Sequence, residues 1–66
     1  MAHERQREIG QWIDARYPRI KSNFPQQKFR MELNMLLQSG TPEAEAEERA
    51  LADVRSQHPG FLPVTR

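Results

Sequence analysis

The chain has no cysteine, so no disulfide can hold its 66 residues together. Its only two histidines are His3 and His58, and two histidines without cysteine do not make a structural zinc site. No apolar run approaches the length that crosses a membrane, and no segment has the pattern of a signal peptide. We therefore expect a cytoplasmic protein without cofactor, metal or membrane contact.

A strong charge of one sign is also missing. The net charge is +1 at pH 7, which gives no overall attraction to nucleic acid. Hydrophobic residues make up 36% of the chain and the mean hydropathy is -0.90, so any core must be thin. Domains of this size often gain stability from a disulfide, a metal or association. Because the first two are excluded, self-association or a partner remains.

The spacing of the apolar residues predicts an all-α fold, a small three-helix domain that occupies the whole chain. We expect a single domain over residues 1–66, with helices at about 3–17, 25–39 and 42–57 and a short ordered tail at 58–66. The expected core is made of large apolar side chains from all three helices: Trp12, Ile13, Phe29, Leu33, Leu36, Leu51 and Val54.

Capping signals define the ends of the second and third helices. Ser22 or Asn23 can cap the second helix, and Gly40 supplies the left-handed residue that ends it. Thr41 is then expected to cap the third helix, with Pro42 at its first position. Because this connection is so short, the second and third helices should form a tight antiparallel hairpin.

The second helix has two apolar sides. One side consists of four large residues within an arc of about 100°: Phe29, Leu33, Leu36 and Leu37. Met31 and Met35 point nearly the opposite way, and Phe24 joins them if the helix begins near Asn23. Either the neighbouring helices cover both sides, or the methionine side stays open for another chain.

No residue pattern indicates catalysis. The serines have no elbow glycines around them, and neither histidine lies in a recognisable pairing motif. The acidic residues between Glu43 and Glu48 lack the ligand spacing of a calcium loop and the histidines of a zincin. We therefore expect no catalytic residue and predict that the protein is not an enzyme.

Residues 16–30 carry five positive charges and no acid: Arg16, Arg19, Lys21, Lys28 and Arg30. Aromatic residues lie among them, a pattern that can bind phosphates and stacked bases. Residues 43–55, with five acids and two arginines, carry a net charge of -3 and could neutralise this segment instead. A helix-turn-helix is disfavoured, because it would bring the acidic start of the third helix against the phosphates of the major groove.

These patterns favour a small non-enzymatic regulator that binds another protein stoichiometrically, as an inhibitor, an adaptor or a regulatory subunit. The residues predicted to bind the partner are Phe24, Lys28, Arg30, Met31 and Met35. Homodimerisation through the same residues would complete the thin core. The alternative is a nucleic-acid-associated regulator that binds phosphates through the five basic residues of segment 16–30. A structural subunit of a larger assembly would use the same apolar side, and nothing in the residues names the partner.

Overall fold

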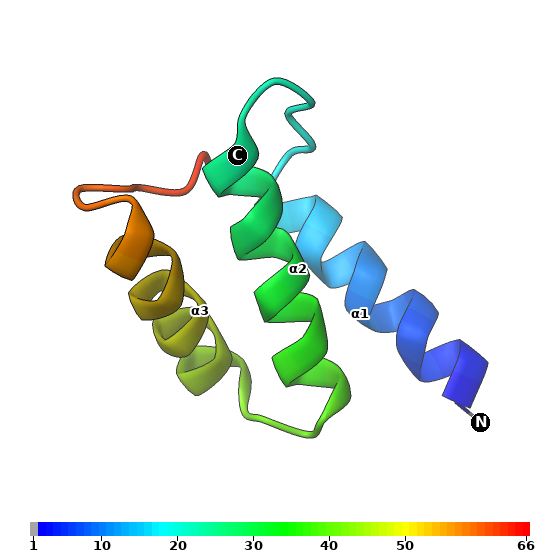
Figure 1. Ribbon diagram of the computed structural model, residues 1–66. Helices are drawn as coiled ribbons and strands as arrows, with labels where there is room; N and C mark the ends of the chain where they lie inside the picture. The colour runs from blue at the N-terminus through cyan, green and yellow to red at the C-terminus, as the bar shows by residue number, and fades with distance from the viewer. Residues whose placement is uncertain (1) are drawn as a thin grey trace.

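The structure, a computed structural model, describes the backbone of residues 2–66 and the side chains of residues 4–66. It has three helices, α1 (Ala2–Arg16), α2 (Phe24–Gln38) and α3 (Glu43–Gln57), each close to its predicted bounds. In Figure 1, α2 lies between α1 and α3 and runs antiparallel to both. The predicted all-α fold with a hairpin of α2 and α3 is thus confirmed. The side chain of His3 lies outside the described residues, and no described helix has the length and apolarity needed to cross a membrane.

The start of α2 follows one of the two predicted caps. Asn23, not Ser22, is the N-cap, and its side-chain oxygen accepts a hydrogen bond of 2.9 Å from the backbone N–H of Gln26. Pro25 lies in the first turn, where the missing N–H of a proline costs no helical hydrogen bond. As a result α2 begins at Phe24, early enough to include that residue.

The connection between α2 and α3 corrects one prediction. Gly40 adopts a φ of 92°, and its N–H donates to the Leu37 carbonyl at 3.1 Å. The N–H of Thr41 donates to the Leu36 carbonyl at 3.0 Å, which completes a Schellman motif at the end of α2. Thr41 therefore does not cap α3. Because Thr41 still belongs to the end of α2, the chain turns one residue later, and Pro42 takes the N-cap position without a side-chain hydrogen bond.

The core lies on one side of α2, where α1 and α3 meet it. Its buried apolar residues are Ile13, Tyr17, Phe29, Leu33, Leu37, Ala46, Ala50 and Val54. Four of the seven predicted core residues are in this set, and the other three, Trp12, Leu36 and Leu51, are partly buried against it. The two buried alanines let α3 approach α2 closely. The Tyr17 ring meets the Phe29 ring edge-on, with 4.9 Å between centroids.

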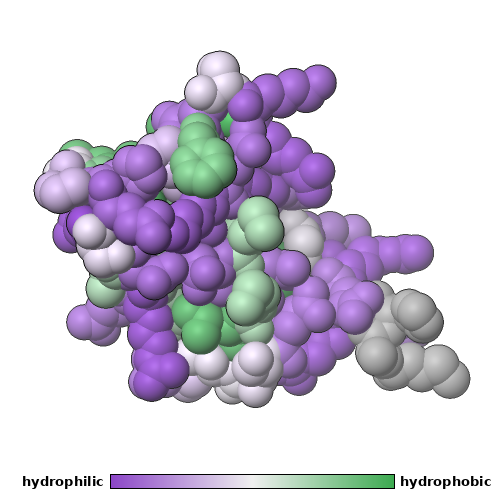
Figure 2. Space-filling view, viewed as in Figure 1, coloured by the Kyte–Doolittle hydropathy of each residue, from purple (hydrophilic) through white to green (hydrophobic). Residues whose placement is uncertain are grey.

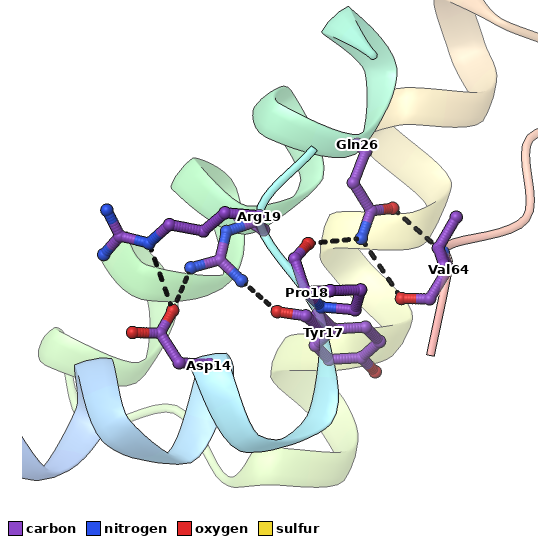
Figure 3. Close-up of polar contacts among 7 residues, drawn as sticks. Asp14, Tyr17, Pro18, Arg19, Gln26 and Val64 are labelled. Carbon is purple, nitrogen blue, oxygen red and sulfur yellow. Dashed lines mark hydrogen bonds and ion pairs between the residues drawn. The ribbon is translucent and has the colours of Figure 1, made fainter. Parts of the chain in front are cut away.

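Gln26 is the buried polar residue of this core. Its side-chain oxygen accepts from the Val64 N–H at 3.0 Å, and its amide nitrogen donates to the Val64 carbonyl at 3.2 Å (Figure 3). The same nitrogen donates to the Pro18 carbonyl at 3.5 Å. The side chain is fully buried, and these bonds satisfy its polar atoms. The sequence held a signal for this burial, because Gln26 lies three residues before Phe29 and seven before Leu33 on the same side of the helix.

The C-terminal tail crosses from the end of α3 toward the start of α2 (Figure 1). The Phe61 ring lies 5.9 Å from the Phe29 ring, and the Arg55 side chain donates to the Phe61 carbonyl at 2.9 Å. At the end of the tail, the Arg66 N–H donates to the Arg16 carbonyl at 3.2 Å. The tail therefore joins the ends of α1 and α3 at the end of the molecule where α2 begins.

We expect Gln26→Leu to lower the free energy of unfolding by about 1–3 kcal/mol, because the Val64 N–H and two carbonyls lose their partner. Urea denaturation measures this loss, and amide hydrogen exchange at Val64 reports release of the tail. Gln11→Leu, an exposed change on α1, is the matched control and should change stability by less than about 0.5 kcal/mol. Unchanged exchange at Val64 in Gln26→Leu would show that Gln26 does not hold the tail.

Candidate protein-docking face

The side of α2 opposite the core carries large apolar side chains in contact with solvent. Phe24 is 66% exposed, Met31 66% and Met35 59%. At about 100° per residue these three side chains fall within an arc of about 40°, and we call them the α2 face. Figure 2 shows apolar surface over α2 on the side viewed, interrupted by polar side chains. Within one chain this side of α2 is therefore not core.

The two flanks of α2 contact different helices. On one flank, Lys28 donates to the side-chain oxygen of Gln57 in α3 at 2.6 Å. On the other flank, Arg30 bonds to Asp14 of α1. Because α1 and α3 are held at these flanks, neither reaches over Met31 and Met35. The open face follows from the packing of α1 and α3 against the other side of α2.

Arg30 is engaged within the chain. Its side chain is only 13% exposed, and its guanidinium donates to the Asp14 carboxylate and to the Tyr17 carbonyl at the end of α1. This hydrogen bond from Arg30 lowers the pKa of the Asp14 carboxyl, with a further contribution from Arg19. Arg19 donates to the same carboxylate at 3.3 Å (Figure 3). We predicted that Arg30 contacts a partner, but its observed contacts hold α1 against α2, and we leave it out of the α2 face.

Arg16, a second basic residue of segment 16–30, pairs with an acidic residue of α3. The Arg16 guanidinium lies 3.4 Å from the Glu47 carboxylate and 4.9 Å from the centre of the Trp12 ring. The Tyr17 hydroxyl donates to the same carboxylate at 2.7 Å. Burial raises the pKa of the Tyr17 hydroxyl, and the neighbouring carboxylate adds to the rise. The acidic helix thus neutralises Arg16, one of the two arrangements that the sequence allowed.

A groove of about 620 Å³ lies beside the α2 face, between α1 and α2. Its lining includes three basic residues and no acidic one: Gln6, Gly10, Ile13, Arg19, Ile20, Lys21, Gln27, Arg30, Met31, Asn34 and Gln38. Met31 belongs both to this groove and to the α2 face. On the α1 side, a Cβ added at Gly10 would meet no atom within 4 Å. The groove therefore has open space at Gly10.

A second hollow, of about 750 Å³, lies near the connection of α2 and α3. Its charged lining residues are Arg5, Glu8 and Glu43, which are of both signs, and no residue of the α2 face lines it. We therefore place the candidate site at the α2 face and the groove beside it.

His58, at the end of α3, packs near this face. Its ring lies 6.2 Å from the Phe24 ring in an edge-on arrangement, and its backbone N–H donates to the Val54 carbonyl at 2.9 Å. Among the described residues, no three side chains of His, Asp or Glu gather in a way that could hold a metal ion. The contact that the structure shows for the His58 ring is therefore packing beside the Phe24 ring.

No protein-family model, no curated protein and no solved structure shows significant similarity to this chain. Its function therefore has to be argued from the α2 face, the groove and the distribution of charge.

We expect Asp14→Asn to lower the free energy of unfolding at pH 7 by about 1 kcal/mol, because Arg30 loses its ionised acceptor. Asp14 is 44% exposed, so solvent screening keeps the effect this small. The pKa of Asp14 is lowered by folding, so the stability it adds is present above its unfolded pKa of about 4 and is lost as the pH falls through the folded value.

Urea denaturation of wild type and Asp14→Asn between about pH 7 and about pH 2 tests this dependence. The two stability curves should converge at the acid end. Asp53→Asn, which changes an exposed acid of α3, is the control and should follow the wild type at neutral pH. A difference between Asp14→Asn and wild type that stays constant over the whole range would contradict a role for the ionised carboxylate.

Proposed function

We propose that this protein is a non-enzymatic regulator that binds another protein stoichiometrically through the α2 face, as an inhibitor, an adaptor or a regulatory subunit. One observation carries the proposal. Three of the five large apolar side chains exposed among the described residues lie on a single side of one helix, and that helix is held from behind by the core. Apolar side chains gathered in this way typically mark an interaction surface.

The chemistry of the α2 face suits protein recognition. Met31 and Met35 are one helical turn apart, so their side chains are neighbours on the surface. Methionine is flexible and polarizable, and it adapts to irregular apolar surfaces. Phe24 adds a large ring at the first residue of the same helix. Burial of such apolar groups stabilises a complex by about 25 cal/mol for each Å² removed from water. A helix that presents residues at this spacing can enter an apolar groove of a partner.

The charges around the face support docking to protein more than to nucleic acid. Arg16 pairs with Glu47, while Arg19 and Arg30 share Asp14, so three of the five basic residues have an acidic partner within the chain. The first turns of α3 also expose Glu43, Glu45 and Glu48, which would repel phosphates. Lys28, beside the α2 face, bonds to the uncharged side chain of Gln57, so its positive charge can still steer an acidic partner.

A cysteine-free chain suits a reducing cytoplasm, which we propose as the compartment of this regulator.

A second copy of the chain is another occupant of the α2 face. Sedimentation equilibrium over a wide concentration range separates the two, because a monomer has a mass of 7.8 kDa. A dimer that dissociates when Met31 and Met35 are changed would assign the face to self-association.

We expect the double variant Met31→Glu with Met35→Glu to keep the fold and to weaken partner binding at least about tenfold, because it places charges in the centre of the docking surface. Both side chains are exposed, so the free energy of unfolding should change by less than about 0.5 kcal/mol. Circular dichroism checks the fold, and affinity capture with each variant as bait measures partner recovery.

The matched control is Ala52→Glu with Leu62→Glu, which adds the same two charges at exposed positions away from the α2 face. It should recover the same partner as the wild type. Recovery of that partner by the methionine variant would refute the proposal, and loss of folding in the methionine variant would show that the face is needed as core.

A further inference from the structure

We infer that the groove between α1 and α2 receives an acidic segment of the protein partner. One large apolar side chain of that segment would lie over Gly10 and Met31, and its carboxylates would meet Arg19 and Lys21. This inference rests on the proposed function, because Met31 joins the groove to the α2 face.

The charge of the groove favours an anion. Its lining has three cations, Arg19, Lys21 and Arg30, and no acid. Arg19 and Arg30 share the single carboxylate of Asp14, so three positive charges less one negative charge leave +2 at the groove. Arg19 remains 77% exposed and Lys21 is exposed, so both can reach a bound carboxylate. An acidic segment supplies the charge that the groove lacks.

The space in the groove favours a large apolar side chain. Gly10 leaves room where any other residue would project a side chain, and a Cβ there meets nothing within 4 Å. Ile13, Ile20 and Met31 provide apolar surface around this space. A volume of about 620 Å³ lies within the usual range of ligand pockets. A leucine or phenylalanine side chain can therefore enter while acidic neighbours remain at the rim.

A second copy of this chain is a poor occupant. Its own exposed acidic segment is the start of α3, where the exposed apolar residue among the glutamates is Ala44. Alanine is too small to fill the space over Gly10. The occupant is therefore an acidic segment of a different protein that carries a large apolar side chain.

A pair of synthetic peptides tests this inference on the full chain. Each is an amphipathic peptide of about 15 residues with leucines at helical spacing, flanked by glutamates in one peptide and by lysines in the other. The readout is the change in backbone amide NMR signals during titration. We expect the glutamate peptide to shift Gly10, Lys21 and Met31 and to bind more weakly as salt rises from about 0.02 M to about 0.3 M. The lysine peptide should leave these signals unchanged.

Three variants locate the bound segment. In Gly10→Leu the new leucine side chain occupies the open space of the groove, where a Cβ meets no atom within 4 Å. This variant should therefore stay folded and lose the shifts caused by the glutamate peptide. Ala15→Leu, at an exposed position of the same helix, is the matched control and should bind as the wild type does. Arg19→Gln with Lys21→Gln should weaken binding about tenfold and flatten its salt dependence.

The outcomes separate this inference from the proposed function. Equal binding of both peptides, absence of shifts at Gly10 and Lys21, or full binding by Gly10→Leu would each overturn the groove as the site. If the glutamate peptide shifts only Phe24, Met31 and Met35, the groove inference fails and docking at the α2 face stands. If the Met31→Glu and Met35→Glu variant retains its cellular partner, the proposed function fails whatever the peptides do.

Discussion

The buried amide of Gln26 holds the start of α2, the linker before it and the distant C-terminal tail together. It bonds to both backbone groups of Val64 in the tail and to the Pro18 carbonyl in the α1–α2 linker. With the tail in this position, Phe61 packs on Phe29 and extends the core past the end of α3. A short chain without disulfides gains order in this way from one satisfied polar side chain, because each buried hydrogen bond replaces a contact with water that folding removed.

The open side of α2 results from the small number of apolar residues in the chain. The apolar residues of α1, α3 and the tail are enough to cover one side of the central helix, where Phe29 and Leu33 are buried. Small residues on α3, such as Ala46 and Ala50, bring the helices close but cannot extend around α2. Met31 and Met35 are thus left in solvent, at the cost of exposed apolar surface that a partner would remove from water.

The tertiary structure divides a basic segment that is continuous in the sequence. Arg16 turns toward Glu47 of α3, whereas Arg30 turns toward Asp14 of α1. These residues form one basic segment in the sequence because they are close together along the chain. Their positions in the sequence do not tell which neighbouring helix each side chain points toward. Lys21 and Arg19 remain at the surface, and with Gly10 they form a groove that no local pattern indicated. That groove exists only because two helices meet beside the linker.

Helical periodicity, the glycine at Gly40 and a cap at Ser22 or Asn23 determined the three helices and the hairpin from the sequence alone, because these signals act within a few residues of one another. The same periodicity placed Met31 and Met35 opposite the core residues. Whether a neighbour covers that side depends on where α1 and α3 lie, and only the tertiary structure decided it. The roles of Gln26 and Arg30 were decided in the same way, since their partners, Val64 and Asp14, come from other segments of the chain.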